Sequence, residues 1–417
     1  MQKVVHVIGA GLSGLSAAVR LAEQGQHVCL YEASNAAGGR CRSYFDQALN
    51  RRIDNGNHLV LSGNLSVARF LATIGSSESL WSPDRAEFPF VDLQSGLKWT
   101  VRPDCGRIPW SLLKKSNRVP GSSLGDYLQG LRLIVAGAGQ TVRDCLDADR
   151  QLYRRFWEPM AVSVLNTDPA EASARLLAPV LRETFWRGES ACRPLVVKQG
   201  LSESFVDPAL SYLQSRKCEL TFGARVMALE STANKITGLR LGDRRIGVSA
   251  GDSVILAVPP LAALALVPGL TVPDAFRAIV NGHFLLPGTG SPEMPFIGLV
   301  GGVGHWLFVR NGVASVTVSA AEHLVGMRSE EIARILWPEI VRVLEIPDTR
   351  SVISRIVKEK RATFAQTPAQ VRRRPPAVTE SRNLYLAGDW TDTGLPATIE
   401  GSLASGERAA RYILNAV

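Results

Sequence analysis

Three glycines and one acid near the start of the sequence have the types and spacing needed to bind a dinucleotide. Gly9, Gly11 and Gly14 follow the pattern G-x-G-x-x-G, and Glu32 lies about twenty residues further along the chain. The first glycine permits a tight turn, the second lets the backbone approach a pyrophosphate, and the third lets a helix pack closely on a strand. The acid can accept hydrogen bonds from ribose hydroxyl groups.

The residues around this motif predict the elements that must position it. Residues 4–8 form a short apolar run, broken by His6, and predict a buried parallel strand. Apolar residues at helical spacing continue to Gly25, and residues 27–31 predict a second strand. A glycine pattern alone is a weak signal, but a strand, a helix and a second strand that ends in an acid make it specific. A βαβ unit whose glycines serve only packing is the less favoured alternative.

A second pair of glycines follows the predicted second strand. Gly38 and Gly39 let the backbone lie close to a cofactor, and Arg40 can pair with phosphate or carbonyl oxygens. Residues 54–58 then give a dense polar group, DNGNH, before an apolar run. Such residues are common in a turn that enters a strand, and they also suit the lining of a cofactor site.

A third group of residues lies near the end of the chain. Residues 384–387 predict a strand that ends at Gly388 and Asp389, and a helix is predicted to begin near Thr398 and Ile399. An aspartate on a glycine turn can accept hydrogen bonds from cofactor hydroxyl groups. The N-terminus of the helix favours negative charge through its unpaired N–H groups and its dipole.

Length and charge bound the class of protein. A chain of 417 residues is long for one core, so we expect two domains. A hydrophobic content of 46% with 20% charged residues is ordinary for a globular enzyme. The formal charge of +9 includes small basic clusters such as residues 372–374, which we interpret as a charged, solvated turn. An acidic membrane surface or an anionic substrate is compatible with this charge, whereas nucleic acid is not an expected partner.

The cysteines and the hydropathy pattern favour a cytoplasmic protein. Six cysteines are scattered without C-x-x-C or other ligand spacing, so reduced thiols are expected and a metal site is not. The N-terminus enters the first strand directly, which leaves no room for a signal peptide. No stretch offers about twenty uninterrupted apolar residues, so no membrane span is expected.

These three segments together resemble the flavin amine oxidase and phytoene desaturase superfamily. The resemblance implies FAD as the cofactor and an α/β fold: a Rossmann-like FAD-binding domain of glutathione-reductase type with an interleaved α+β substrate-binding domain. In that superfamily the acid binds the adenosine ribose, and Val226 matches a residue that meets the adenine. The cofactor-binding residues that the resemblance and the motifs imply are Gly9, Gly11, Gly14, Glu32, Gly38, Gly39, Arg40, Gly56, Asn57, Val226, Gly388, Asp389, Thr398 and Ile399.

The order of the patterns predicts a chain that leaves the cofactor domain twice. We assign residues 1–64, 195–267 and 380–417 to the FAD-binding domain. The substrate-binding domain takes residues 65–194, which are mainly helical, and residues 268–379. Aromatic residues at helical spacing in the first insertion are more often core than substrate contacts. Within the insertions and the return segment, we predict helices over 123–137, 142–157, 201–216 and 329–344 and strands over 220–229, 296–300, 305–309 and 314–319.

Two phrases, DNGNHLVLSGN and GDWTDTGLPATIEGS, are similar to a narrower group, the FAD-dependent hydroxysqualene dehydroxylases. Amine oxidases of the superfamily usually carry an aromatic residue near the last motif, and residues 395–399 contain none, so an amine is not the expected substrate. The resemblance implies reductive removal of the allylic hydroxyl group of hydroxysqualene to give squalene, in squalene and hopanoid biosynthesis. The substrate is then an apolar polyprenyl chain.

Two residues are candidates for assisting departure of the hydroxyl group. His58 and Asp392 belong to the motif segments expected near the flavin ring, although each could be only structural. His283, His305 and His323 have no ligand spacing and are interpreted as structural.

Two other functions remain open at this point. One is an oxidative desaturase or oxidase acting on a carotenoid-like polyprenyl substrate. The other is a flavin-bound membrane scaffold for other squalene-pathway enzymes. Because the substrate is apolar, the surface is basic and no span is expected, we predict peripheral association with the inner face of the membrane.

Overall fold

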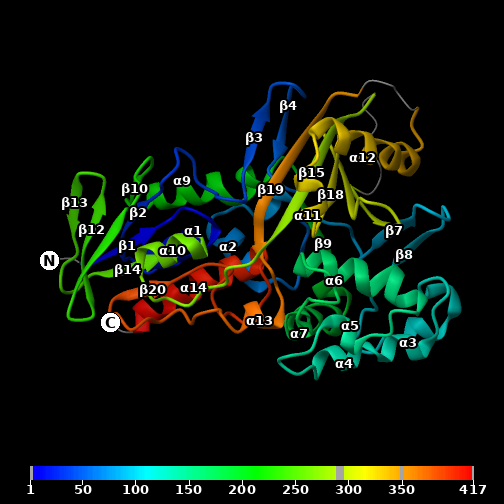
Figure 1. The fold of residues 1–417 in the computed structure, drawn as a ribbon, viewed down its shortest axis with the longest axis horizontal. Coiled ribbons are helices and arrows are strands. Elements are labelled where there is room, and N and C mark those ends of the chain that lie inside the picture. Colours follow the sequence, from blue (N-terminus) through cyan, green and yellow to red (C-terminus); the bar gives the residue numbers. More distant parts are fainter. Residues whose placement is uncertain (1–2, 288–294, 348–351, 416–417) are drawn as a thin grey trace.

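A computed structural model describes residues 3–287, 295–347 and 352–415 (Figure 1). Its first elements are β1 (Val4–Ile8), α1 (Leu12–Glu23) and β2 (His27–Tyr31). Strands β1 and β2 are parallel neighbours, with Val5 opposite Val28. The strand–helix–strand unit that the sequence predicts around the glycine motif is therefore confirmed.

A five-stranded parallel sheet, in the order β10-β2-β1-β14-β20, carries the N-terminal motif. Its strands come from distant parts of the chain, because β10 spans Glu219–Thr221, β14 spans Ser253–Leu256 and β20 spans Leu384–Leu386. The C-terminal helix α14 (Ile399–Asn415) packs on α1 (Figure 1). A Cβ atom at Gly406 would lie 2.1 Å from the Ser13 carbonyl oxygen, so only glycine permits this approach.

A second, seven-stranded sheet lies beside the first, in the order β19-β15-β18-β17-β16-β7-β8 (Figure 1). Its strands pair antiparallel except β7 and β16, which are parallel. The predicted strands near 296–319 and the predicted helix over 329–344 are confirmed. The elements of this part are β7 (Phe88–Asp92), β8 (Lys98–Val101), β15 (Phe276–Leu285), β16 (Phe296–Val300), β17 (Trp306–Arg310), β18 (Val313–Val318), α11 (Glu322–Val325), α12 (Ser329–Leu344) and β19 (Ser354–Phe364).

Short helices form a separate group at the lower right of Figure 1. The predicted long helices over 123–137 and 142–157 are wrong in extent, because the first is divided at Gln129 and the chain is extended at Leu146 after a single short helix. Ser123 and Thr141 each begin a capping box, and residues 153–157 wind as a π-helix. The helices are α3 (Leu124–Leu128), α4 (Gly130–Ile134), α5 (Val142–Cys145), α6 (Glu158–Leu165), α7 (Ala174–Glu183) and α8 (Glu189–Cys192).

The predicted strand over 220–229 is wrong, because the chain turns at Gly223. The Gly223 N–H donates to the Ser34 carbonyl and the Ala224 N–H donates to the Glu32 carbonyl, at 2.9 and 2.8 Å. These bonds carry the chain across the end of β2. A separate three-stranded sheet then follows, made of β11 (Ala228–Thr232), β12 (Lys235–Leu241) and β13 (Arg244–Gly247).

The remaining elements are short strands and helices. In the predicted helix 201–216, a π-helix over 202–206 precedes the α-helix. A small sheet in the order β5-β9-β6 joins the first insertion to the return segment. These elements are β3 (Ser43–Asp46), β4 (Arg51–Asp54), β5 (Val60–Leu61), α2 (Leu65–Thr73), β6 (Leu80–Trp81), β9 (Pro194–Val197), α9 (Asp207–Ser215), α10 (Pro260–Leu266) and α13 (Pro368–Val371).

Helix composition also bears on a membrane span. None of the helices in the described ranges is both long enough and apolar enough to cross a bilayer.

One buried histidine in β15 makes stability depend on pH. His283 is 1% exposed, its Nδ1 lies 2.8 Å from the Ser315 hydroxyl oxygen, and burial lowers its pKa from 6.5 to about 4. The unfolded chain therefore binds a proton at His283 below pH 6.5, whereas the folded chain binds it only below about pH 4. The contribution of neutral His283 to the unfolding free energy is complete above pH 6.5 and is lost as the pH falls towards 4.

We expect His283→Gln to reduce the loss of unfolding free energy between pH 6.5 and 4 by on the order of 3 kcal/mol. Urea unfolding of both proteins across this range measures the effect. An identical pH dependence in the two proteins would show that His283 is not titrated in this way.

Candidate functional site

The glycine loop leaves the N-terminus of α1 open to a ligand. Gly9 has φ +104°, and a Cβ atom at Gly14 would lie 1.9 Å from the Gly9 carbonyl oxygen. At Gly11, in contrast, an added Cβ would meet no atom within 4 Å. No side chain caps α1, and its first turn contains no acid. The first N–H groups of α1 therefore face open space, which suits a pyrophosphate.

Glu32 lies beside this loop at the end of β2. Its Oε2 accepts a hydrogen bond from the Ala10 N–H and its Oε1 accepts one from the Ser34 N–H, both at 2.8 Å. These bonds fix the carboxylate next to the place where a pyrophosphate would lie. Val226 is buried on the segment that crosses the end of β2, so it too lies in this region. The arrangement fits the predicted recognition of an adenosine.

The second glycine pair packs directly on the first motif. The Gly38 N–H donates to the Ala10 carbonyl at 2.8 Å, and Gly38 forms a β-bridge with Gly11. Gly38 and Gly39 have φ +99° and +57°, and a Cβ atom at Gly39 would lie 3.4 Å from the Gly11 Cα atom. Small residues at these positions let two backbone segments meet at one site.

An ion pair joins this N-terminal site to the C-terminal motif. The Arg40 Nη2 atom lies 2.8 Å from the Asp389 Oδ1 atom, and Arg40 also donates to the Ala362 carbonyl. The Asp389 carboxylate is buried and raises the pKa of Arg40. Next to it, the Gly388 N–H donates to the Ser405 hydroxyl group in α14 at 2.9 Å. Residues far apart in the sequence thus form one site.

Arg374 corrects one interpretation made from the sequence. It is 6% exposed rather than part of a solvated turn, and burial lowers its pKa to about 10. It therefore stays protonated at neutral pH and donates to the carbonyls of Asp389, Thr391 and Leu395. These bonds fix the turn that follows Gly388. No local signal in the sequence predicts these bonds, because the acceptors lie in a later segment.

The segment that Arg374 fixes carries Asp392 and leads to α14. Asp392 is exposed, and its Oδ1 accepts a bond from the Gly394 N–H at 3.2 Å. Thr398 and Ile399 lie where α14 begins, as predicted, and the Thr398 hydroxyl oxygen accepts a bond from the Gly401 N–H at 3.1 Å.

Glu400 has a structural role that the sequence did not predict. Its two carboxylate oxygens accept bonds from the Ser66 and Val67 N–H groups at 3.0 and 2.9 Å. Both donors lie in the first turn of α2, so Glu400 links the starts of two helices.

The polar segment 54–58 is anchored on the second sheet. The Asn57 side-chain amide donates to the Thr317 hydroxyl group at 3.0 Å, and the Asn281 amide donates to the Asn55 carbonyl at 3.3 Å. A Cβ atom at Gly56 would lie 3.2 Å from the Asn281 Nδ2 atom. This loop is therefore fixed on β15 and β18 of the second sheet.

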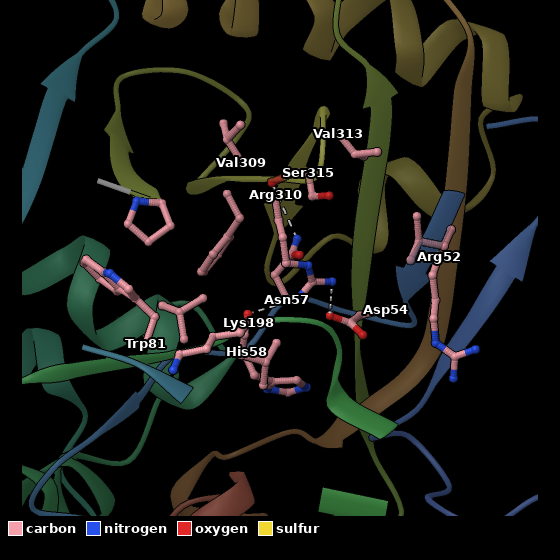
Figure 2. Close-up of a pocket in the computed structure, with 15 residues that line it drawn as sticks. Arg52, Asp54, Asn57, His58, Trp81, Lys198, Val309, Arg310, Val313 and Ser315 are labelled. Carbon is pink, nitrogen blue, oxygen red and sulfur yellow. Dashed lines mark hydrogen bonds and ion pairs between the residues drawn. The ribbon is translucent and has the colours of Figure 1, made fainter. Parts of the chain in front are cut away.

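A cavity of about 270 Å³ adjoins this loop (Figure 2). Polar and apolar groups share its wall, and Asp392 is not among them. Asp54 is its single carboxylate and accepts bonds from Arg310 Nη2, the Ser43 hydroxyl group and the Leu201 N–H. The lining residues are Arg52, Ile53, Asp54, Asn57, His58, Trp81, Val196, Val197, Lys198, Pro295, Phe308, Val309, Arg310, Val313 and Ser315.

His58 is half-buried in the cavity wall. Desolvation lowers its pKa from 6.5 to about 4, and the Asp54 charge opposes this shift only in part. The imidazole is therefore neutral at pH 7. In this state it can donate and accept hydrogen bonds but carries no positive charge.

One group of residues has metal-ligand types outside this site. The ligand atoms of His27, Cys29 and Glu219 lie within 4.8 Å of one another. Burial, with the nearby Glu219 charge, raises the pKa of Cys29 to about 12. A thiol that stays protonated is a poor ligand, so we do not assign a metal to this group.

Comparison with known proteins places these features in a family context. The family model for flavin containing amine oxidoreductases matches residues 12–288 and 308–414. Proteins named hydroxysqualene dehydroxylase from Rhodopseudomonas palustris and Sinorhizobium fredii are each 46% identical, over 100% of this chain and 99% of the relative. A probable zeta-carotene desaturase from Synechococcus elongatus is 23% identical over 99% of this chain and 98% of that protein.

Solved structures show the same fold at low identity. An oxidoreductase from Methanosarcina mazei has a TM-score of 0.72 at 17% identity, over 98% of this chain and 100% of the other. A putrescine oxidase has a TM-score of 0.68 at 16% identity, over 100% of this chain and 99% of the other. The predicted amine oxidase-like fold is therefore confirmed.

We expect Glu32→Gln to weaken FAD retention by about tenfold or more, because bonds to a charged acceptor are stronger than those to an amide. Flavin absorbance of the purified protein after gel filtration, and a titration of the apoprotein with FAD, measure the effect. Glu219→Gln, which changes an exposed acid on the neighbouring strand β10, is the control. Equal FAD affinity in Glu32→Gln and the control would contradict the assignment.

Proposed function

Because this chain belongs to the hydroxysqualene dehydroxylases, within the flavin containing amine oxidoreductase family, we propose that it converts hydroxysqualene to squalene. It is a flavin-dependent oxidoreductase, and FAD is its cofactor. The observation that carries the proposal is the 46% identity over the whole chain. The joined N-terminal and C-terminal motifs supply a site into which FAD fits.

The reaction replaces a hydroxyl group by hydrogen. The allylic C–O bond breaks, and the hydroxyl group takes up one proton and leaves as water. Reduced FAD, when bound, supplies the hydride for the new C–H bond. The protein must therefore hold the carbinol carbon, supply or relay one proton and keep bulk water away.

The cavity has the two kinds of surface that this substrate requires. Trp81, Phe308 and Val309 offer apolar contact for a hydrocarbon chain, while Asn57 and His58 offer hydrogen bonds for one hydroxyl group (Figure 2). A polar group in an apolar setting needs a partner, and a site built to bond a hydroxyl group discriminates strongly against analogues that lack it.

His58 is our candidate for the residue that contacts the hydroxyl group. Its neutral imidazole can donate a hydrogen bond to the hydroxyl oxygen and relay a proton to it, by releasing the proton of one ring nitrogen as the other takes one up from water. Asp392 stays a prediction as a second group that assists departure of water, acting from the exposed turn before α14.

A specific observation favours one alternative function. The 23% identity with a probable zeta-carotene desaturase extends over nearly the whole chain, so oxidative desaturation of a polyprenyl substrate is chemistry found on related chains. Because the sequence identity to the dehydroxylases is higher, oxidative desaturation is the second candidate. Its products would carry additional double bonds.

We further propose that the protein works at a membrane surface. A polyprenyl substrate partitions into the bilayer, so an enzyme without a spanning helix must bind the membrane surface to reach it. Other squalene-forming enzymes would meet the same surface.

An anaerobic single-turnover experiment tests the reaction. The flavin of the purified protein is reduced with dithionite, excess reductant is removed, and hydroxysqualene is added in detergent. We expect reoxidation of the flavin together with formation of squalene. A flavin that stays reduced, or products with new double bonds, would overturn the proposal.

We expect His58→Leu to slow this reoxidation by about a hundredfold, the usual contribution of a positioned proton-transfer group. Because the neutral form predominates above pH 4, the wild-type rate should stay flat from pH 5.5 to 8. His323→Leu, a change at an exposed histidine in α11, is the control. Unchanged turnover in His58→Leu would remove His58 from the mechanism, and a rate that rises steadily towards pH 4 would show that the protonated form is active.

A further inference from the structure

One continuous segment, residues 105–137, exposes an unusual amount of apolar surface. It carries seven of the sixteen large hydrophobic side chains that are exposed in the described parts of the chain. In its loop, Ile108, Trp110 and Leu113 are 57%, 66% and 63% exposed. Scattered apolar residues on a surface are ordinary, but a contiguous group of this kind marks an interaction site.

Hydrogen bonds within the loop fix its backbone while these apolar side chains stay exposed. The Asp104 carboxylate accepts bonds from the Ser111 N–H and hydroxyl group, at 3.0 and 2.8 Å. The Arg118 guanidinium donates to the carbonyls of Leu112 and Leu113, at 2.6 and 3.0 Å. The backbone is thus fixed by its own polar contacts, while its apolar side chains stay more than half exposed among the residues that the structure describes.

The following helices continue this surface. The Val119 N–H donates to the Tyr127 hydroxyl group at 2.8 Å, which ties the loop to α3. Along α3, α4 and the residue after α4, exposed apolar residues recur at intervals of four, three and four, so they share one helical face. They are Leu124, Leu128, Leu131 and Val135, with exposed fractions of 40%, 66%, 53% and 81%.

Positive charges surround the apolar residues. Arg107, Lys114, Lys115 and Arg132 are exposed, and none of them forms an ion pair with any residue that the structure describes. The single acid between residues 105 and 137 is Asp126, which is buried and accepts a bond from the Ser123 N–H. The exposed charge of this surface is therefore entirely positive.

We propose that residues 105–137 dock the enzyme on an anionic lipid bilayer. The seven apolar side chains enter the boundary between head groups and acyl chains, with Trp110 at the level that tryptophan prefers. The four cations meet lipid phosphates. This inference rests on the membrane association proposed above and names the surface that achieves it.

The charge pattern favours a bilayer over a second copy of this chain. Two copies that met through this surface would place like charges opposite each other, which opposes association. The surface also lies at the end of the molecule where α3 and α4 are seen, away from the β12–β13 hairpin (Figure 1). The FAD-binding sheet would therefore stay clear of the membrane.

Vesicle flotation of the full-length, FAD-loaded protein tests the apolar part. The vesicles contain phosphatidylcholine with phosphatidylglycerol. We expect Trp110→Ser combined with Leu128→Ser to weaken binding by about tenfold or more, because buried side chains set the strength of such anchoring. Leu65→Ser combined with Met227→Ser, at positions that are 54% and 57% exposed elsewhere, is the control and should bind like the wild type.

A second pair of variants tests the charges. Lys114→Glu combined with Lys115→Glu should lose binding to phosphatidylglycerol vesicles, whereas Arg240→Glu combined with Arg244→Glu on the β12–β13 hairpin should not. Cys105 is the one exposed cysteine of the six, so an environment-sensitive fluorophore attached there should shift to the blue when vesicles are added. A fluorophore whose emission does not change on bound protein would place the contact elsewhere.

Three further results would overturn the inference. Equal vesicle binding by the wild type and both variant pairs would reject this surface and leave membrane association itself standing. A wild-type dimer that the Trp110 and Leu128 changes convert to a monomer, without vesicle binding, would show an interface between copies. The absence of any vesicle binding would reject peripheral association altogether.

Turnover of hydroxysqualene in detergent separates the surface from the chemistry. The docking variants should keep this turnover, since no residue changed lines the cavity. A wild-type protein that binds vesicles but does not convert hydroxysqualene would reject the proposed reaction and leave the docking surface standing.

Discussion

The site depends on the ion pair between Arg40 and Asp389. It joins the glycine-rich loops of the N-terminal segment to the turn before α14, which the sheet order β1-β14-β20 and the packing of α14 on α1 bring close together. Arg40 also bonds the Ala362 carbonyl in β19, so the same side chain reaches the second sheet. A buried carboxylate needs a fixed cation, and this one is supplied from the opposite end of the chain. The cofactor site is therefore a product of the whole fold.

The second sheet gives this cofactor site its substrate side. Segment 54–58 leaves the first motif region and is fixed on β15 and β18 through Asn281 and Thr317. His58 consequently lies in the wall of a cavity that polar and apolar groups share. A neutral imidazole in such a wall suits a hydroxylated hydrocarbon and does not suit a cationic amine. The absence of an aromatic residue over 395–399 points the same way.

Features that depend on local geometry can be predicted from the sequence, whereas features that depend on contacts with distant residues cannot. The glycine motif, Glu32 and α12 could be predicted because spacing and periodicity carry the information within a short window. The prediction of a solvated Arg374 is wrong, since nothing near it in the sequence shows that its guanidinium is surrounded by carbonyls from residues 389–395. The turn at Gly223 could not be predicted, because bonds to Glu32 and Ser34, just after β2, and not local propensity, set the course of the chain after β10.

The direction of hydride transfer is the central claim, and deuterium labelling tests it most directly. Reduced enzyme is prepared anaerobically in D2O, so that the exchangeable hydrogen at the flavin N5 is deuterium, and is mixed with hydroxysqualene. The account predicts squalene with one deuterium on the carbon that carried the hydroxyl group. Squalene without deuterium, or a product with an additional double bond, would contradict it.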